Sequence, residues 1–197
     1  MVLLSVGRAV EKKGYDDLLA ALALLPPSLA WRFVHIGGGA LTDDLRRQAH
    51  RLRLDGRIEW RGAQAHPSVL AAYREADLFV LAAKIGRDAD RDGLPNVLME
   101  AQSQRLACVA TRLSGIVELI LDGHTGVLVS PGNPAALAAS LAALIGDPER
   151  RRRLATAGEM RVRQQFDARQ GITHLAALFQ LPPEPAPAAA PPAAAAD

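Results

Sequence analysis

Short apolar runs alternate with helix-like segments along most of this chain, and no other feature limits its fold as much. Strands are expected at residues 2–6, 31–36, 58–61, 78–81, 108–111 and 127–129, and helices at 15–25, 41–53, 66–75, 95–104 and 134–180, the last interrupted near Gly146 and near Gly158. This alternation is typical of a parallel sheet covered by helices. The predicted fold class is therefore α/β, a Rossmann-like open parallel sheet with helices on both faces.

The composition indicates one globular domain followed by a tail. The chain has 197 residues, of which 49% are hydrophobic, so it has enough apolar material for one sizeable core. Residues 182–197 contain six Pro and eight Ala, a composition that buries too little surface to offset its ordering entropy. We expect a domain at 1–181 and a disordered tail at 182–197.

Charge and cysteine content exclude several classes of protein. The 23 Lys and Arg nearly balance the 21 Asp and Glu, so no nucleic-acid partner is expected. The single cysteine, Cys108, cannot form an internal disulfide. No apolar run approaches the ~20 residues of a membrane-spanning helix, and no signal peptide is recognisable. We expect a cytoplasmic protein without a transmembrane segment. Peripheral contact with the inner face of the membrane is compatible with this expectation.

Ligands of open α/β sheets bind at the carboxyl ends of the strands, so the loops there are the places to look for chemistry. The first of them carries Arg8 and Lys13 between Gly7 and Gly14. Two cations on one loop can close on a diphosphate, with Arg8 as a planar fork and Lys13 as a point charge. Taken alone, the same residues also fit an ordinary solvated loop.

A second group of polar residues surrounds the start of the helix expected at 95–104. Asp92 and Glu100 lie eight positions apart, with Gly93 and a helix-starting Pro95 between them. The free amides after Pro95 can bind an anion, and Glu100, about one turn further along, can accept hydrogen bonds from a ribose. The alternative is that Glu100 only belongs to the polar face of an amphipathic helix.

Other sites fit these residues less well. Asp88, Asp90 and Asp92 resemble a calcium-binding loop, but Met99 occupies the position of the last ligand. Asp88 and Asp90 also form a D-x-D pair of a kind that binds metal ions in some enzymes, but a solvated acidic loop explains them equally simply. A nicotinamide dinucleotide site needs G-x-G-x-x-G after the first strand, which this chain lacks. The five histidines have no metal-ligand spacing, so we expect no metal site.

Several motifs, taken in order, resemble the C-terminal, donor-binding half of retaining glycosyltransferases of the GT-B fold, family 4, also called glycosyl transferases group 1. They are Gly7-Arg8 with Lys13-Gly14, Ile36-Gly-Gly-Gly39, Ala76-Asp77-Leu-Phe-Val-Leu81, Asp92-Gly-Leu-Pro-Asn-Val-Leu-Met-Glu100-Ala101, Gly115-Ile-Val-Glu118 and Asp122-Gly-His-Thr-Gly126. The resemblance runs from about Val2 to about Phe166. It is specific as a set and weak in any single piece.

The resemblance implies a hexosyltransferase that uses a nucleoside diphosphate sugar, such as UDP- or GDP-hexose, with retention and without a cofactor or metal. It implies catalytic roles for Arg8, Lys13 and Asp92, and substrate binding by Gly7, Gly93, Leu94, Pro95, Asn96, Val97 and Glu100. Asp92 departs from the family, which usually has glutamate there.

The family's N-terminal, acceptor-binding domain has no counterpart here, and the chain opens directly on an expected core strand. We therefore expect a half that is catalytically incomplete unless a separate N-terminal-domain chain supplies the rest, and that is either a truncated reading frame or one subunit of a split enzyme. The alternative is a non-catalytic nucleotide-binding or protein-interaction module that has kept the fold.

Overall fold

A six-stranded parallel sheet forms the centre of the protein, which a computed structural model describes over residues 1–87 and 89–181. The strands lie in the order β3-β2-β1-β4-β5-β6. They are β1 (Val2–Val6), β2 (Arg32–Ile36), β3 (Ile58–Trp60), β4 (Leu78–Leu81), β5 (Ala107–Thr111) and β6 (Val127–Val129). This arrangement confirms the predicted Rossmann-like α/β fold.

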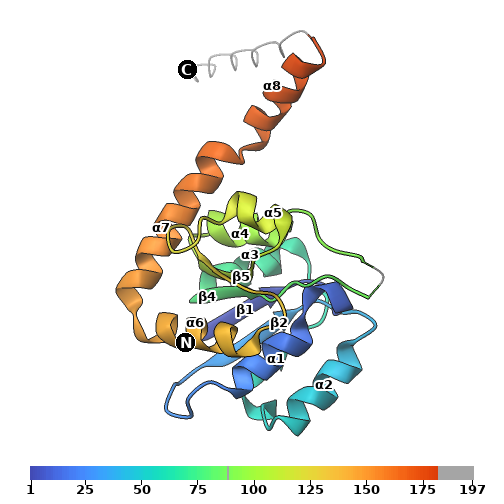
Figure 1. The fold of residues 1–197 in the computed structure, drawn as a ribbon, viewed down its shortest axis with the longest axis vertical. Helices are drawn as coiled ribbons and strands as arrows, with labels where there is room; N and C mark the ends of the chain where they lie inside the picture. The colour runs from blue at the N-terminus through green and yellow to red at the C-terminus, as the bar shows by residue number, and fades with distance from the viewer. Residues whose placement is uncertain (88, 182–197) are drawn as a thin grey trace, which may run out of the picture.

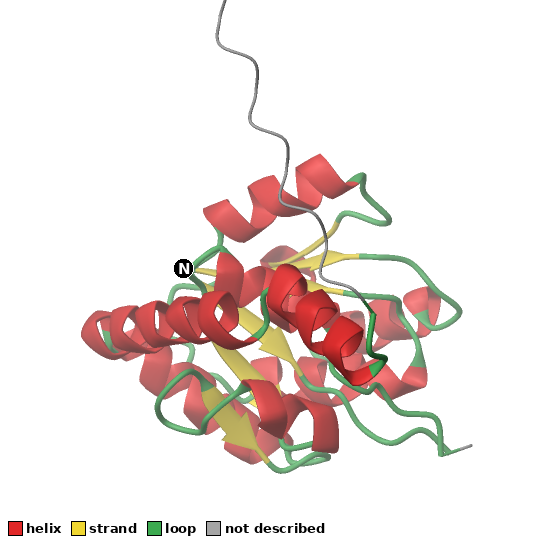
Figure 2. Ribbon diagram, turned by 90° about the horizontal axis from the view of Figure 1, so that it is seen from above, coloured by secondary structure: helices red, strands yellow, loops and turns green. Residues whose placement is uncertain are grey.

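Helices cover both faces of the sheet (Figure 1). They are α1 (Tyr15–Ala23), α2 (Thr42–Arg51), α3 (His66–Glu75), α4 (Asn96–Ser103), α5 (Ser114–Leu119), α6 (Pro134–Gly146), α7 (Pro148–Gln165) and α8 (Ala168–Leu178), with short 3-10 turns η1 (Glu11–Lys13) and η2 (Asp55–Arg57). Figure 2 shows these helices around the sheet in a second view. Apolar side chains of α1, α2 and α6 pack on one face, and those of α3, α4 and α5 pack on the other.

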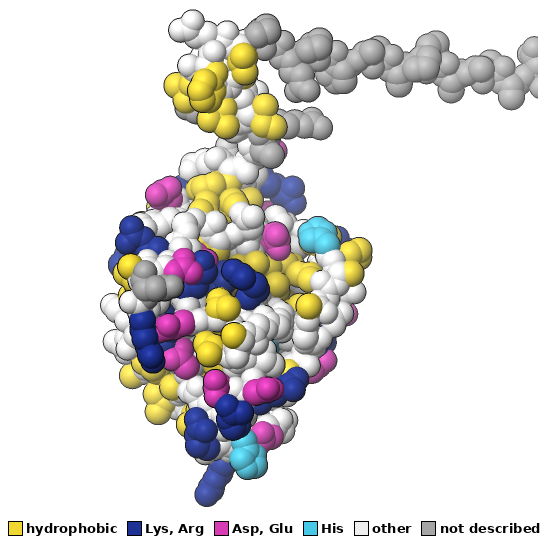
Figure 3. Space-filling view, turned by 90° about the vertical axis from the view of Figure 1, so that its right-hand side faces the viewer, with side chains coloured by type: hydrophobic (Ala, Val, Ile, Leu, Met, Phe, Trp, Pro, Cys, Tyr) yellow, Lys and Arg dark blue, Asp and Glu magenta, His cyan; other side chains and the backbone are white. Residues whose placement is uncertain are grey.

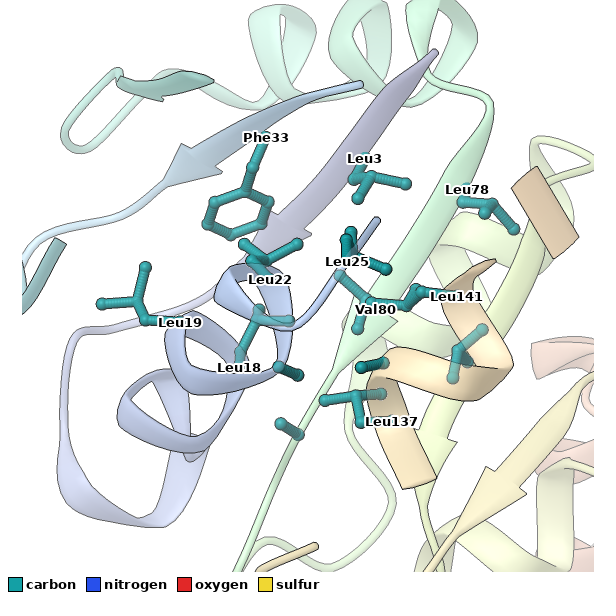
Figure 4. Packing of buried hydrophobic residues seen from close by; sticks show 14 of the residues in the cluster. Leu3, Leu18, Leu19, Leu22, Leu25, Phe33, Leu78, Val80, Leu137 and Leu141 are labelled. Atoms are coloured by element: carbon teal, nitrogen blue, oxygen red, sulfur yellow. The ribbon is translucent and has the colours of Figure 1, made fainter. Parts of the chain in front are cut away.

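The core follows from the strand sequences, which are apolar on both faces. On the face covered by α1 and α6, Leu18 and Leu22 pack with Leu141 against the sheet residues Leu3 and Val80 (Figure 4). Each of these five side chains is almost completely buried. Burial on both faces is the usual environment of a parallel sheet, and it holds the carboxyl ends of the strands in place.

Several boundaries differ from the predictions. The interruption after Gly146 is confirmed, but the next one lies at residues 166–167, between α7 and α8. The expected break near Gly158 is wrong, because α7 continues through it. A Cβ at Gly158 would lie 2.9 Å from Nε2 of Gln102 and 3.0 Å from the carbonyl oxygen of Thr125, so the glycine allows close packing and does not interrupt the helix. Pro95 is the residue before α4 and not its first residue. The short helix α5 was not predicted, because its region read as a loop.

The expected tail, 182–197, lies outside the described residues, and one domain at 1–181 stays a prediction. No helix in the described part of the chain is both long enough and apolar enough to cross a bilayer.

Helix α8 extends away from the body of the domain (Figure 1). Its exposed apolar side chains include Ile172, Leu175 and Leu178, and the exposed Phe179 and Leu181 follow it. An apolar group of this size in water favours association with another surface.

Shortening the chain to end at Asp167 should leave the free energy of unfolding within about 0.5 kcal/mol of the parent value, because little core packing is lost. The same change should reduce self-association, measured by sedimentation at high protein concentration. A chain ending at Leu181 is the matched control, since it keeps α8. Stronger association after removal of α8, or loss of the cooperative unfolding transition, would contradict this.

His35, near the end of β2, links the sheet to the first loop. Its side chain is buried between Tyr15 and Trp60, with ring centroids 4.5 and 5.4 Å away. Nε2 lies 3.1 Å from the carbonyl oxygen of Gly7, so in the neutral ring Nε2–H is the donor. Burial lowers the pKa of His35 to about 4, although the hydrogen bond to Gly7 acts in the opposite direction.

This pKa shift predicts a loss of stability in acid. Between the ordinary His pKa of 6.5 and about 4, the unfolded chain binds a proton at His35 that the folded chain does not bind. The free energy of unfolding should therefore fall as the pH drops through this window, by about 3 kcal/mol from this residue. Denaturant titrations of the parent and His35→Gln at pH 7 and pH 4 measure it. Gln keeps a donor but does not titrate, so equal pH dependence of the two proteins would refute the assignment.

Candidate functional site

The candidate site lies where the strand order reverses, between β1 and β4. Both strands end at the same edge of the sheet, and their following loops, 7–14 and 82–95, lie in contact. The amide of Lys84 donates to the carbonyl oxygen of Lys12 at 2.8 Å. A Cβ on Gly14, whose φ is +61°, would lie 1.8 Å from the carbonyl oxygen of Ala82, so only glycine allows this approach. A reversal of strand order is where open α/β sheets bind ligands.

Charged side chains from the two loops form a compact ion-pair cluster, which we define as Lys12, Lys13, Asp90 and Asp92. Nζ of Lys13 lies 2.6 Å from Oδ2 of Asp92. Nζ of Lys12 lies 3.5 Å from Oδ1 of Asp92 and 3.0 Å from Oδ1 of Asp90. The side chains of Lys13 and Asp92 are only 13% and 14% exposed. The hydrogen bond to Asp90 is the main reason that the pKa of Lys12 is raised.

The face of the molecule that carries the loop after β4 is shown in Figure 3, where basic and acidic side chains alternate. Two of the cluster's four side chains are cationic and two are anionic, so their charges cancel. The exposed Arg8 lies on the same edge of the sheet and adds a positive charge. The backbone beside Arg8 is held by the end of β2 and the loop after it. The amide of Gly7 donates to the carbonyl oxygen of Ile36 at 2.9 Å, and that of Ala9 donates to the carbonyl oxygen of Gly38 at 2.9 Å.

The start of α4 forms the next part of the site. Pro95 is buried, Asn96 is exposed, and no side chain caps the helix. Gly93 is exposed, while Leu94 and Val97 are half-buried and pack on the core. A Cβ on Gly115, in α5, would lie 2.3 Å from the carbonyl oxygen of Gly93, so this glycine allows the loop to approach α5.

Glu100 lies further along α4 and is half-buried. Its Oε2 accepts a hydrogen bond of 3.0 Å from the hydroxyl of Tyr73, which is fully buried on α3. Burial, followed by the negative charge of Glu100, raises the pKa of the Tyr73 hydroxyl, so the hydroxyl stays protonated and acts as a donor. A buried side chain therefore holds the carboxylate of Glu100. A glutamate that only forms part of the polar face of an amphipathic helix would not need such a partner.

The structure thus brings Lys13 and Asp92 into direct contact, while Glu100 contacts Tyr73 and Arg8 remains exposed. Sequence reasoning missed Lys12, His35 and Tyr73, and it noted Gly115 only as part of a motif. Lys12 could have been found from the sequence, because it lies next to Lys13 in the same loop. The other two look like ordinary core residues in a sequence, and only tertiary contacts reveal their partners.

The calcium interpretation finds no support in the described acidic residues. Asp90 and Asp92 contact lysine side chains, which compete with a cation for the same oxygens. Within residues 1–87 and 89–181, no three His, Cys, Asp or Glu side chains are grouped as a metal site requires. Asp88 lies outside the described residues, and the absence of a metal remains an expectation.

Known proteins are similar to this chain in sequence. A putative colanic acid biosynthesis glycosyltransferase from Salmonella typhimurium is 33% identical over 180 residues, which cover 90% of this chain and 44% of that protein. A glycogen synthase from Mycobacterium tuberculosis is 31% identical over 178 residues, covering 90% of this chain and 42% of the relative. The chain therefore spans less than half the length of these relatives.

Solved structures of other proteins share the fold of this chain. HepE from Anabaena, crystallised in complex with UDP, has a TM-score of 0.80 and 25% identity, over 91% of this chain and 48% of that one. The C-terminal domain of a group 1 glycosyl transferase from Francisella tularensis shares the fold, with a TM-score of 0.74 and 24% identity, over 85% of this chain and 87% of that domain.

The family model described as "Glycosyl transferases group 1" matches residues 1–161, the whole of the sheet and most of α7. Together with relatives at 30% identity or more over nine-tenths of the chain, this match identifies the family. The protein belongs to the group 1 glycosyl transferases.

Proposed function

We propose that this chain is the donor-binding half of a retaining glycosyltransferase that transfers a hexose from a nucleoside diphosphate sugar. The observation that carries the proposal is the contact between Lys13 and Asp92 across the β1/β4 reversal, in a chain of this family. It joins a cation suited to a diphosphate with a carboxylate suited to a sugar hydroxyl.

In this proposal Lys13 and Arg8 bind the diphosphate, aided by the amides at the start of α4. A departing diphosphate gains negative charge as its bond to the sugar breaks, and preorganised donors stabilise that charge. By comparison with other anion-stabilising donors, each cation contributes about 2 to 4 kcal/mol of transition-state stabilisation. Asp92 already contacts Nζ of Lys13, so a diphosphate has to compete with that carboxylate for the lysine.

Asp92 and Glu100 divide the rest of the donor between them. Glu100 accepts hydrogen bonds from the ribose, and Asp92 accepts one from a hydroxyl of the sugar. Asp92 is one methylene shorter than the glutamate usual in the family, so its carboxylate reaches less far from the loop. Gly93 leaves room for the sugar, since a Cβ there would meet nothing within 4 Å.

The transfer breaks the bond between the anomeric carbon and the diphosphate oxygen and forms a bond from that carbon to the acceptor oxygen on the same face. The acceptor proton passes to the departing phosphate oxygen, so the chain needs no basic side chain for this step. The nucleoside diphosphate leaves with the proton, and no cofactor or metal takes part.

The acceptor would be bound by a domain outside this chain, which spans less than half of its relatives. We propose that a separate N-terminal-domain chain supplies it, in the cytoplasm or at the inner face of the membrane. The similar proteins differ in the nucleotide base of their ligands. HepE was crystallised with UDP and with UDP-glucose, while a mannosyltransferase from Mycolicibacterium smegmatis, 30% identical, is named GDP-mannose-dependent.

Calorimetry with UDP and with GDP tests the site. Lys13→Ala, Arg8→Ala and Glu100→Gln should each weaken binding of the preferred nucleotide about 10-fold or more, because each removes a charge-assisted hydrogen bond. Arg163→Ala and Glu149→Gln, at exposed positions on α7, are matched controls and should bind like the parent.

No binding by the parent, or parent-like binding by all three site variants, would refute the site. The non-catalytic alternative makes its own prediction: the chain would bind nucleotide but transfer no sugar when an N-terminal-domain chain and an acceptor are supplied.

The variant Asp92→Asn tests whether Asp92 competes with the ligand for Lys13 or holds Lys13 in place for it. Removing the carboxylate frees Lys13, so the affinity for inorganic pyrophosphate should rise about 3- to 10-fold. Asp90→Asn is the control, because Asp90 pairs with Lys12 and not with Lys13, and its gain should be smaller. Weaker pyrophosphate binding by Asp92→Asn would mean that the ion pair holds Lys13 in place and does not compete with the ligand.

A further inference from the structure

We infer that Tyr73 is a positioning residue: its buried hydroxyl orients the carboxylate of Glu100 toward the ribose of the bound nucleotide. This inference rests on the proposed function, since it assigns a second residue to the same donor site. Tyr73 itself does not touch the ligand and acts only through Glu100.

The geometry of the contact supports this role. The hydroxyl of Tyr73 donates to Oε2 of Glu100 at 3.0 Å and also lies 3.3 Å from the carbonyl oxygen of Val97, one turn earlier on α4. One phenol therefore contacts both the backbone and the carboxylate of the same helix. Within the described residues, Glu100 has no other side-chain hydrogen bond, which leaves its second carboxylate oxygen for a ligand.

Burial makes the phenol a rigid support. The Tyr73 side chain is fully buried, and its ring packs on Phe79 of β4 with the centroids 5.7 Å apart. A ring wedged between α3 and the sheet cannot change rotamer freely. Glu100, by contrast, is half-buried with several rotatable bonds, and an unsupported glutamate loses that freedom when it binds a ligand.

Core packing alone does not explain a tyrosine here. The surrounding cluster is made of apolar side chains such as Leu98 and Ala101, where phenylalanine would fill the same space. A buried hydroxyl costs free energy unless it finds a partner, and the nearer partner here is the carboxylate of Glu100. The high pKa of the phenol keeps its proton in place as a donor.

The test compares UDP with 2′,3′-dideoxy-UDP, which lacks both ribose hydroxyls, by calorimetry on the parent and on Tyr73→Phe. Phe keeps the packing and removes only the hydroxyl. Tyr73→Phe should bind UDP about 5- to 20-fold more weakly and dideoxy-UDP as the parent does. In a Glu100→Gln background, the added Tyr73→Phe change should have less than a 2-fold effect, because the carboxylate it orients is gone.

A structural role would weaken both nucleotides equally, and that result would overturn the inference. Parent-like UDP binding by Tyr73→Phe, with weakened binding by Glu100→Gln, would overturn it as well and leave the proposed function intact. If the parent binds neither nucleotide, the proposed function fails and the inference fails with it.

Discussion

The contact between the loops after β1 and β4 is the constraint on which the rest of the site depends. It requires glycine at position 14, where a Cβ would collide with the carbonyl oxygen of Ala82, and it is reinforced by the hydrogen bond from Lys84 to Lys12. Strand order makes this contact possible, because β1 pairs with both β2 and β4. Lys13, at the end of the 3-10 turn η1, and Asp92 are 79 positions apart in the sequence and meet across this contact.

Charge at this edge of the sheet is balanced before any ligand arrives. Two lysines face two aspartates, and Arg8 stands outside the pairs. A half-buried ion pair loses hydration on both sides, so its net contribution to folding is small and its main effect is to fix geometry. A diphosphate would change this balance by offering Lys13 a second anion. Under the proposed function, Lys13 contacts Asp92 in the free chain and exchanges this anion for the diphosphate when the ligand binds.

Local sequence patterns predicted most of the fold. All six strands were expected within one residue of their observed bounds, because apolar runs in a parallel sheet reflect burial directly. The error at Gly158 has a tertiary cause: glycine usually weakens a helix, but here it allows α7 to pack closely on Gln102 and Thr125. The short α5 was missed because six residues give little periodicity.

The sequence indicates the residue types of the candidate site but not their contacts. Arg8, Lys13, Asp92 and Glu100 were candidates because of their places beside glycines and a helix start. Their partners were not, since Tyr73 lies 27 residues from Glu100 and sits among apolar positions of α3. A buried tyrosine looks the same in a sequence whether its hydroxyl serves a site or merely finds an acceptor. Only the three-dimensional arrangement distinguishes the two.

The central claim is that the diphosphate, the lysine of the first loop and the glutamate of α4 meet in one cleft. A crystal structure of the chain with UDP tests this most directly. We expect a phosphate oxygen within hydrogen-bond distance of Nζ of Lys13, and the ribose hydroxyls within hydrogen-bond distance of the carboxylate of Glu100. UDP bound elsewhere on the protein, with the Lys13–Asp92 pair undisturbed and Glu100 facing solvent, would contradict it.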